Sequence, residues 1–332
     1  MIRGIHYCRA FAAIGVILYH IATTASANNI ETELFEIFKW GNLGVDFFFV
    51  ISGFIIHYIH HKHFGKANFC YNYAKKRILR VYPIYLSVFF LKFLILLVAG
   101  INFKDYQTAE YFLCSMLLIP IENEFPFITV AWTLSHEMTF YILYIIPIAL
   151  GKYFLYLGII FWSFLIIFSD IFYSDLYFII RFLMSPYNLQ FIIGILFSIF
   201  YLAERKYSVL LFTITSVFFF LIANETTNEV AQRGLTGFGF GFVLLVFVRI
   251  DITKINKFIF IDKFLILVGN ASYSIYLTHT LLISSIYILI YKYNIYYLGI
   301  FALFSSIIIG VLIWLIIENP VLKFLNSKFI NK

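Results

Sequence analysis

The sequence predicts an all-α protein, a polytopic bundle of about ten transmembrane helices that forms a single domain over residues 1–332. Hydrophobic residues make up 62% of the chain, charged residues only 12%, and the mean hydropathy is +0.92. A soluble domain carries about 25% charged residues, so this chain has too little charge to cover a surface in water. Because no polar linker divides the chain, one domain is expected.

About ten apolar stretches approach the roughly 20 residues that a helix needs to cross a bilayer. They cover residues 7–25, 43–59, 78–99, 130–150, 153–169, 176–203, 209–223, 235–248, 264–290 and 296–317. A further stretch at 111–119 is too short to span and is expected to lie at the interface or to re-enter the membrane. Pro320 follows the last stretch and is expected to end its helix.

The charges between these stretches predict their orientation, because loops rich in lysine and arginine stay in the cytoplasm. The segment 61–80 has lysines and arginines but no acidic residue, so it is expected to be cytoplasmic. The other basic residues expected on the cytoplasmic side are Arg3, Arg9, Lys152, Arg205, Lys206, Arg249, Lys254, Lys257, Lys263, Lys323, Lys328 and Lys332. The opposite side receives Glu31, Glu33, Glu36, Glu110, Glu122, Glu124, Asp170, Asp175, Glu225 and Glu229. Both termini are therefore predicted to be cytoplasmic, and a span at 111–119 would reverse most of the later basic loops.

The net charge of +7 does not indicate a nucleic-acid partner, because the basic residues lie in short loops beside apolar stretches. The expected partner of such a surface is the lipid bilayer. Cys8, Cys70 and Cys114 lack the spacing of a metal site, so free thiols and no metal are expected.

The N-terminus has a second interpretation. Arg3 and Arg9, the apolar run and the small residues at 25–27 also resemble a cleavable signal peptide. His20 inside the run favours a helix that is retained.

The first span carries two ionisable residues, which are costly in a bilayer and mark candidate functional sites. Arg9 and His20 lie eleven residues apart, which brings them to within about 20° of one helix face and about 16 Å apart along the axis. A neutral imidazole is suited to act as a base near pH 7. The alternatives are a surface anchor for Arg9 and a structural hydrogen bond for His20.

The third span begins with Arg77 and Arg80, which share a helix face at the cytoplasmic end. Their forked guanidinium groups suit phosphate oxygens. The alternative is an ordinary pair of positively charged anchors.

Polar residues also interrupt three other spans. In the fourth, Glu137 lies well inside the helix, Tyr141 follows one turn later on the same face, and Trp132 precedes them. His136 points to another face and is expected to be structural. In the second, Asp46 is expected near the outer surface, and the small residues at 52–53 let helices approach closely. In the ninth, a polar stripe at i, i+4 and i+7 consists of Ser272, Tyr276 and His279.

Together these residues resemble the acyltransferase-3 family of polytopic membrane acyltransferases. The matching elements occur in the family's order over nearly the whole chain. They are Arg9 with His20, the run GVDFFFVISGF at 44–54, Arg77 and Arg80 followed by Tyr82 and Pro83, Trp132 to Leu134 with Glu137, Ser272 and Tyr273 with Tyr276, Leu277 and His279, and Glu318 with Pro320. His6 departs from the small polar or acidic residue expected there. The resemblance implies a ten-helix core that stands alone, without the SGNH hydrolase-like domain of some members.

The resemblance implies an O-acyltransferase in the bacterial plasma membrane. The donor substrate is acyl-CoA, with acetyl-CoA as the leading expectation. The acceptor is a hydroxyl of a cell-envelope carbohydrate, free or lipid-linked, such as O-antigen of lipopolysaccharide, lipo-oligosaccharide, capsular polysaccharide or peptidoglycan. Arg9 and His20 match the family's essential pair in the first helix, and Arg77 and Arg80 match its motif linked to the donor. Because all three arginines are predicted at the cytoplasmic surface, where coenzyme A is, Arg9 is also expected to contact the donor. The expected substrate contacts are Asp46, Trp132, Tyr141, Ser272, Tyr276 and His279.

The mechanism expected from these residues is direct transfer. His20 takes the proton of the acceptor hydroxyl, which attacks the thioester carbonyl. Glu137 orients His20 or stabilises its imidazolium, as a carboxylate does behind a catalytic histidine. An acyl-histidine intermediate is the open variant. The separation of about 16 Å between Arg9 and His20 is of the order of a pantetheine arm.

Two other classes of protein remain as alternatives. Ionisable residues within spans also mark the pathways of transporters, although no inverted repeat is evident. A structural or assembly protein without chemistry would have no reason to place His20 and Glu137 within spans.

Overall fold

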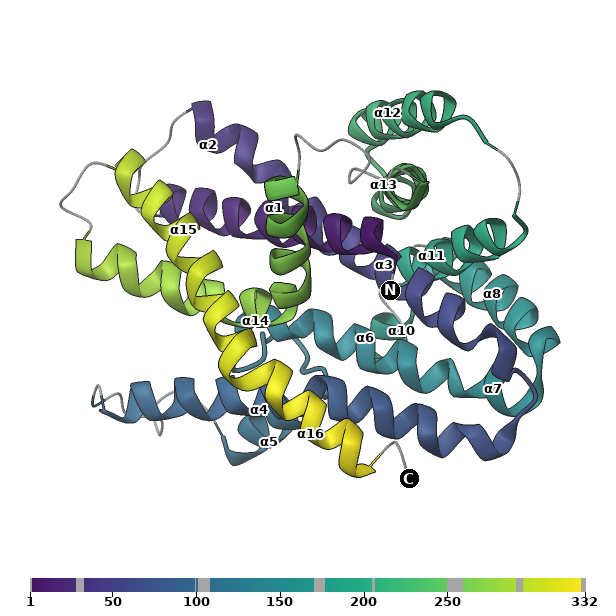
Figure 1. Cartoon of the computed structure of the whole chain (residues 1–332), viewed down its shortest axis with the longest axis horizontal. Helices are drawn as coiled ribbons and strands as arrows, with labels where there is room; N and C mark the ends of the chain where they lie inside the picture. Colours follow the sequence, from purple (N-terminus) through teal and green to yellow (C-terminus); the bar gives the residue numbers. More distant parts are fainter. Residues whose placement is uncertain are drawn as a thin grey trace. The chain divides into compact units, whose positions relative to one another are not determined.

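The computed structural model describes residues 2–27, 33–98, 100, 108–169, 177–204, 207–249, 259–290 and 295–329. These residues form helices and connecting turns and include no strand, which confirms the predicted all-α class (Figure 1). Several residues of the orientation prediction lie outside the described residues, namely Glu31, Asp170, Asp175, Arg205, Lys206, Lys254, Lys257 and Lys332. The side of the membrane on which each loop lies stays a prediction.

Within the described residues, 8 helical segments are long and apolar enough to cross a membrane. They are Arg3–Ala27, Glu36–His63, Ala67–Val98, Thr129–Leu150, Phe178–Leu202, Glu229–Arg249, Ile259–Ile286 and Tyr297–Leu325. Two shorter apolar helices, Lys152–Ile167 and Val209–Glu225, correspond to the fifth and seventh predicted spans. Each predicted stretch is therefore helical, and the chain is a multi-pass membrane protein.

The described helices follow one another along the chain in the order in which they are numbered. Their bounds are α1 (Arg3–Ala27), α2 (Glu33–Phe38), α3 (Leu43–His60), α4 (Cys70–Val98), α5 (Ala109–Leu117), α6 (Trp132–Leu143), α7 (Ile145–Leu150), α8 (Lys152–Ile167), α10 (Phe178–Leu183), α11 (Tyr187–Leu202), α12 (Val209–Glu225), α13 (Glu229–Arg249), α14 (Ile259–Ile290), α15 (Ile295–Ile313) and α16 (Asn319–Phe329). Short 3₁₀ turns precede α3, α4 and α6.

The short stretch predicted at 111–119 is the helix α5, which has 9 residues. The Thr108 side chain accepts a hydrogen bond from the Tyr111 backbone N–H at 3.2 Å and caps its start. Leu118 ends it in the left-handed conformation, with φ of 58°. A helix of this length rises only about 14 Å, so it is too short to cross a bilayer, as expected.

Prolines divide two of the predicted spans. The stretch 130–150 is split into α6 and α7, and α6 ends at Leu143, four residues before Pro147. A proline ring clashes with the carbonyl group four residues earlier, which accounts for that end. The stretch 176–203 is split into α10 and α11 around Ser185 and Pro186, because a residue that precedes proline avoids the helical region.

The prediction that Pro320 ends the last helix is wrong. The helix α15 passes into a π-helical turn at Trp314–Glu318, and α16 continues from Asn319. Pro320 is the second residue of α16, where its missing N–H costs little because the first turn of a helix has no intrahelical partner for it. The wider π-helical turn just before it changes the hydrogen-bond register and accommodates the ring.

The chain divides into two compact units, each assembled from segments far apart in the sequence. Unit 1 contains Met1–Ala12, Leu43–Ala74 and His136–Gly269, and unit 2 contains Ala13–Asn42, Lys75–Ser135 and Asn270–Lys332. The single domain over residues 1–332 stays a prediction.

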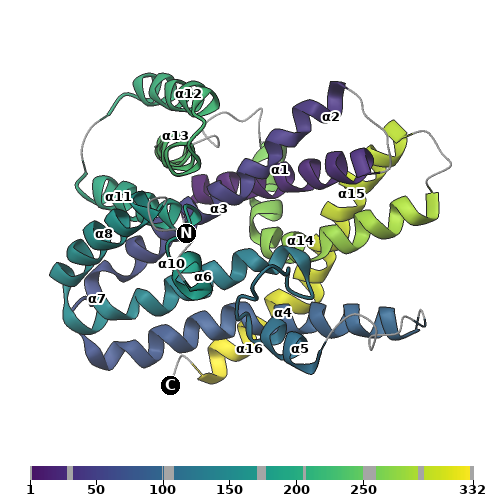
Figure 2. The same cartoon turned by 180° about the vertical axis from the view of Figure 1, so that it is seen from behind.

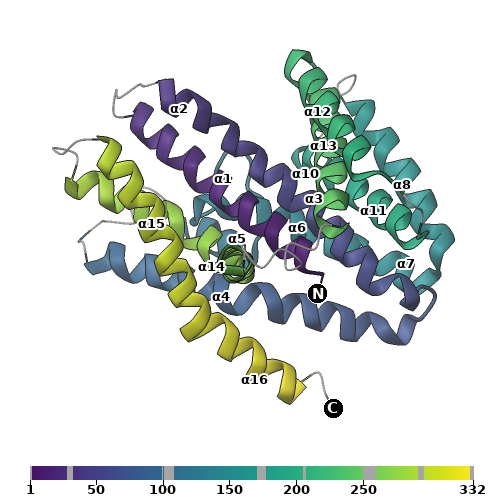
Figure 3. The same cartoon turned by 45° about the horizontal axis from the view of Figure 1, so that its top comes forward.

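In unit 1, α3 packs closely against α11, and α12 lies beside α13 (Figures 1 and 3). A Cβ on Gly53 of α3 would lie 2.1 Å from the carbonyl oxygen of Phe191, and one on Gly194 of α11 would lie 2.1 Å from that of Val50. Any larger residue would push the two backbones apart. The expected close helix approach at 52–53 is therefore confirmed.

In unit 2, α5 lies beside α4 (Figure 2). Two tyrosines of α4 bond to α5. The Tyr82 hydroxyl donates to the Leu117 carbonyl oxygen at 2.8 Å, and the Tyr85 hydroxyl donates to the Ser115 carbonyl oxygen at 2.5 Å. The bond from Tyr82 satisfies a carbonyl group at the C-terminal end of α5, where helices leave carbonyl groups without helical partners. The Ser115 carbonyl oxygen also accepts from the Leu118 N–H at 3.2 Å.

Candidate functional site

The polar stripe on α14 faces the interior of unit 2. Ser272 and His279 are fully buried and Tyr276 is nearly so. The Tyr276 hydroxyl lies 2.9 Å from the Thr133 hydroxyl and 3.1 Å from the Val130 carbonyl oxygen. These contacts tie α14 to the start of α6, where Trp132 is half-buried.

His20 lies beside His279 in the same unit. Their ring centroids are 5.0 Å apart, with the ring planes tilted by 52°. His20 extends from α1 and is half-buried, whereas His279 is completely buried on α14. The sequence predicted both residues as site residues, but from separate motifs, and the structure brings them together.

His279 has one ring nitrogen bonded and one without a partner. Its Nδ1 lies 3.2 Å from the Ile275 carbonyl oxygen. A carbonyl oxygen only accepts, so Nδ1 carries the proton and Nε2 carries a lone pair. Within the described residues, the buried Nε2 has no hydrogen-bond partner. Most buried polar atoms in proteins have one, so this atom marks a place for a further group.

The arginine pair of α4 belongs to the same unit. Arg77 and Arg80 are both half-buried, and Arg80 makes no hydrogen bond or ion pair with any residue that the structure describes. The Tyr273 hydroxyl on α14 donates to the Val81 carbonyl oxygen at 2.9 Å. The helix that carries His279 therefore contacts α4 directly after Arg80. Tyr273 precedes His279 by six residues, which corresponds to about 9 Å along the helix.

Unit 1 contains the other predicted catalytic residue, Glu137. Its Oε1 accepts hydrogen bonds from the Ser52 hydroxyl at 3.1 Å and from the Tyr141 hydroxyl. The latter bond confirms that Tyr141 lies on the same face one turn later. Ser52 was predicted only as a small packing residue, and its hydroxyl joins α3 to α6 through this carboxylate. Arg9, which is 9% exposed, also belongs to unit 1.

His136 is structural, as expected. Its Nδ1 lies 3.1 Å from Asn188 Oδ1, and its ring stacks on Phe182 with centroids 4.1 Å apart. The Asn188 side-chain amide in turn donates to the carbonyl oxygens of Phe182 and Leu183 at 3.1 and 2.9 Å. This histidine thereby fixes the break between α10 and α11.

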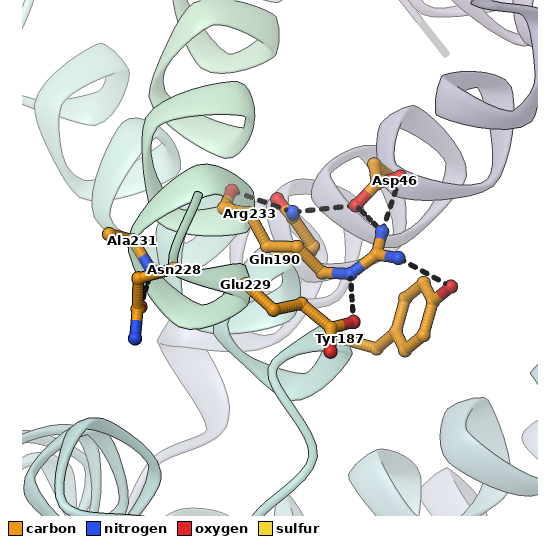
Figure 4. A network of polar contacts seen from close by, with 7 residues as sticks. All are labelled: Asp46, Tyr187, Gln190, Asn228, Glu229, Ala231 and Arg233. Carbon is orange, nitrogen blue, oxygen red and sulfur yellow. Dashed lines mark hydrogen bonds and ion pairs between the residues drawn. The ribbon is translucent and has the colours of Figure 1, made fainter. Parts of the chain in front are cut away.

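Asp46 is engaged in a buried ion pair (Figure 4). Its two carboxylate oxygens accept hydrogen bonds from Arg233 Nη1 at 2.9 and 3.0 Å, and the Gln190 amide donates to Oδ1 at 2.8 Å. Arg233 also donates to the Tyr187 hydroxyl at 2.7 Å and to Glu229 at 3.1 Å. Asp46 is only 1% exposed, so its carboxylate is closed off in this structure. Its predicted role as a substrate contact stays a prediction.

The sequence analysis did not single out Arg233, Gln190 or Tyr187. Arg233 fell in the loop before the predicted span 235–248, but α13 already begins at Glu229, where the Asn228 side chain caps the Ala231 N–H at 2.9 Å (Figure 4). One signal was available. An arginine on the side otherwise occupied by Glu225 and Glu229 is an exception to the charge pattern, and Asp46 within a span requires a counter-charge.

The predicted site residues thus fall into two groups. Unit 2 contains His20, Arg77, Arg80, Trp132, Ser272, Tyr276 and His279, and unit 1 contains Arg9, Asp46, Glu137 and Tyr141. The predicted contact between Glu137 and His20 stays a prediction. Cys8, Cys70 and Cys114 are free thiols, as expected. No group of three or more His, Cys, Asp or Glu side chains in the described ranges is arranged to hold a metal ion.

Comparison with known proteins gives one clear result. The family model described as an acyltransferase domain, acyltransferase 3, matches residues 2–318. Comparisons with the curated proteins and with the solved structures found no match. The matched region covers nearly all of the transmembrane helices and both histidines of unit 2. The chain therefore belongs to the acyltransferase-3 family of membrane proteins.

Proposed function

We propose that this protein transfers an acyl group, acetyl in the first instance, from acyl-CoA to a hydroxyl of a cell-envelope carbohydrate at the bacterial plasma membrane. Membership of the acyltransferase-3 family supports acyl transfer as the reaction class. The observation that carries the proposal is the position of His20, which lies beside a buried histidine in the unit that also holds the arginine pair of α4.

Arg77 and Arg80 are proposed to hold the phosphates of acyl-CoA. An arginine within a membrane span normally pairs with an acidic side chain or snorkels to the surface. Arg80 is half-buried and, within the described residues, has no such partner, so an anionic ligand would supply the missing counter-charge. Guanidinium groups bind phosphate oxygens through two parallel hydrogen bonds. Arg9 is added to the donor contacts on the resemblance of its motif.

His20 is proposed as the general base. It removes the proton of the acceptor hydroxyl while the hydroxyl oxygen attacks the thioester carbonyl carbon. The carbon–sulfur bond then breaks, and the proton passes from His20 to the departing sulfur of coenzyme A. An acyl-histidine intermediate is the alternative, in which His20 itself attacks the thioester before the hydroxyl does. Glu137 is proposed to orient His20 or to stabilise its charged form.

The acceptor is proposed to contact the polar groups that share unit 2 with His20, namely Trp132, Ser272 and Tyr276. The Tyr276 hydroxyl is held in place by Thr133 and Val130, so it can bind a sugar hydroxyl in a fixed position. Tyr141 and Asp46 are further proposed contacts, although in this structure they bind Glu137 and Arg233.

The acceptor and the acyl type can be tested in the native membrane. Deletion of the gene, followed by mass spectrometry of the envelope glycans, should remove one acyl modification, and its mass identifies the acyl group. The wild-type gene should restore the modification, and a gene encoding His20→Gln should not. Unchanged glycans in the deletion strain would contradict the proposed acceptor class.

A further inference from the structure

Within the described residues, the buried Nε2 of His279 has no hydrogen-bond partner, and its ring lies beside that of the proposed general base, His20. The residue is completely buried in unit 2, and its Nδ1–H donates to the Ile275 carbonyl oxygen one turn earlier on α14. That bond fixes the tautomer, because only the protonated nitrogen can donate to a carbonyl oxygen. The remaining nitrogen is therefore a hydrogen-bond acceptor that points away from its own helix backbone.

Two aromatic rings of the described residues lie close to the His279 ring, and the His20 ring is closer than the Tyr276 ring. The centroid of the His20 ring lies 5.0 Å from that of His279. A direct N–H···N hydrogen bond of about 3 Å between two imidazoles, with each nitrogen about 1 Å from its ring centre, also gives a centroid separation of about 5 Å. The two rings, whose planes are tilted by 52°, make no hydrogen bond within the described residues, and the inference requires the His20 ring to rotate until one N–H faces Nε2. His20 is half-buried, whereas the completely buried His279 is bonded to the Ile275 carbonyl oxygen.

We propose that His279 is a positioning residue, whose Nε2 accepts the N–H of His20 and holds the His20 ring with its other nitrogen toward the acceptor hydroxyl. This inference rests on the proposed function of His20 and refines the predicted role of His279 as a substrate contact. When His20 takes up the hydroxyl proton, both of its nitrogens carry protons. One N–H bonds to His279, and the other returns its proton to the thiolate of coenzyme A.

The surroundings of His279 support this assignment over direct contact with a substrate. Tyr276, one turn before it, is bonded to the start of α6, and its ring centroid lies 5.7 Å from that of His279. Gly310 of α15 lies directly against α14, since a Cβ there would come within 2.4 Å of the Ile275 side chain. Because its own helix is fixed on both sides, His279 provides a rigid acceptor for its neighbour His20.

The test compares two substitutions at position 279. His279→Phe keeps a ring but removes the acceptor, and it should lower kcat by about 10–100-fold, a loss like that seen when the group that orients a metal-bound histidine is removed. The KM for acetyl-CoA and for the glycan should stay unchanged. His279→Gln retains an acceptor oxygen and should recover part of the lost kcat. The matched control is His57→Phe, at a buried histidine in unit 1 that lies 2.9 Å from the Ser198 hydroxyl.

Three results would overturn the inference. An unchanged kcat in His279→Phe would show that His20 needs no such partner. A raised KM for the glycan with an unchanged kcat would make His279 a substrate contact. Equal losses in both variants at position 279, with the same loss in His57→Phe, would indicate a general packing defect. The failure of the proposed function is separate, because then the wild-type protein itself would transfer no acyl group.

A measurement that is independent of activity completes the test. Nitrogen-15 NMR of histidine-labelled protein in nanodiscs distinguishes the two neutral tautomers, and the His279 signal is assigned by its loss in His279→Phe. The inference requires the proton on Nδ1. A proton on Nε2 would contradict it, whatever the kinetic result.

Discussion

Two buried polar clusters, one in each unit, use their hydrogen-bonding groups to different extents. In unit 1 the Arg233 side chain donates to Asp46, Glu229 and Tyr187 and lies over the Tyr187 ring at 3.7 Å from the centroid. In unit 2 the His279 ring has a single bond and leaves Nε2 without a partner in the described residues.

This difference in hydrogen bonding indicates a structural role for the cluster in unit 1 and a functional role for the one in unit 2. A charged pair whose hydrogen bonds are met within the protein ties its helices together and has little capacity left for a ligand. Here it joins α3, α11 and α13. A buried acceptor without a partner is a cost to the folded state. Gln190 Oε1 in unit 1 is also such an acceptor within the described residues, but His279 Nε2 lies beside His20, whose N–H we propose as its partner. We therefore expect substitutions in the two clusters to have different effects, on stability in unit 1 and on turnover in unit 2.

The largest effect on turnover is expected at His20. His20→Gln keeps a polar side chain but cannot act as a base near pH 7, and loss of a general base lowers a rate by about 10²–10⁴-fold. Initial rates of coenzyme A release at saturating acetyl-CoA measure this effect. The variant should be expressed and inserted like the wild type. Near-normal turnover in His20→Gln, with loss of expression in His20→Ala, would make His20 a structural residue.

The largest effect on stability is expected at the ion pair of unit 1. Arg233→Met leaves the buried Asp46 carboxylate without its counter-charge, which typically destabilises a protein by about 3–5 kcal/mol. Thermal unfolding in detergent should show a lower Tm, while kcat per folded molecule stays close to that of the wild type. The double variant Asp46→Leu with Arg233→Met removes both charges and should recover much of the Tm. A selective loss of kcat with an unchanged Tm would assign this cluster to the active site.

The arginine pair of α4 should affect donor binding rather than either stability or the chemical step. A hydrogen bond to a charged group contributes about 1.5–3 kcal/mol, so Arg80→Ala should weaken acetyl-CoA binding by about 10–100-fold. Arg80→Lys should restore little of the lost affinity for acetyl-CoA, because lysine lacks the forked guanidinium group that binds two phosphate oxygens. Calorimetric titration with acetyl-CoA measures both variants. Unchanged donor affinity in the variant Arg77→Ala with Arg80→Ala would return both residues to the role of membrane anchors.

A smaller and more diagnostic effect is expected at Glu137. If this carboxylate only orients a neighbour, Glu137→Gln should keep part of the activity, because the amide oxygen still accepts the hydroxyl protons of Ser52 and Tyr141. If its charge stabilises the imidazolium of His20, the loss in kcat should approach that of His20→Gln. Full activity in Glu137→Gln would restrict the essential chemistry to unit 2.

Orientation can be tested without altering the folded protein. Reporter fusions after Lys76, Lys206 and Lys257 should report a cytoplasmic position, and fusions near Glu33, Glu124 and Asn228 an extracytoplasmic one. Asn228 precedes the helix that carries Arg233, so the same experiment assigns the ion pair to one side of the membrane. A cytoplasmic signal near Asn228 would mean that 111–119 crosses the membrane after all.

The sequence was sufficient to predict the helical spans, because about 20 apolar residues have few other structures available in a bilayer. It did not predict the π-helical turn at Trp314–Glu318, which was read only as the end of a helix at Pro320. The breaks before Pro147 and Pro186 follow from proline geometry, but hydropathy alone conceals them. Hydropathy therefore predicts where the spans lie, but not the breaks and the π-helical turn within them.

The residues of the candidate site could be predicted from the sequence, but the contacts between them could not. The spacing of Ser272, Tyr276 and His279 defines a helix face, yet nothing in one sequence places His20 next to that face. Asp46 and Arg233 are separated by 187 positions, and their pairing depends on how α3 and α13 pack. The tautomer of His279 depends on a single backbone contact that only coordinates reveal.

The central claim is that His20 catalyses acyl transfer from acyl-CoA. The most direct test incubates the purified protein in nanodiscs with acetyl-CoA labelled in the acetyl group and with envelope glycan. Mass spectrometry then follows the label into the glycan. We expect labelled glycan and an equal amount of free coenzyme A with the wild type, neither with His20→Gln, and both with His57→Phe, which alters a buried histidine outside the proposed site. Labelled glycan at the wild-type rate from His20→Gln, or no transfer by the wild type, would contradict the central claim.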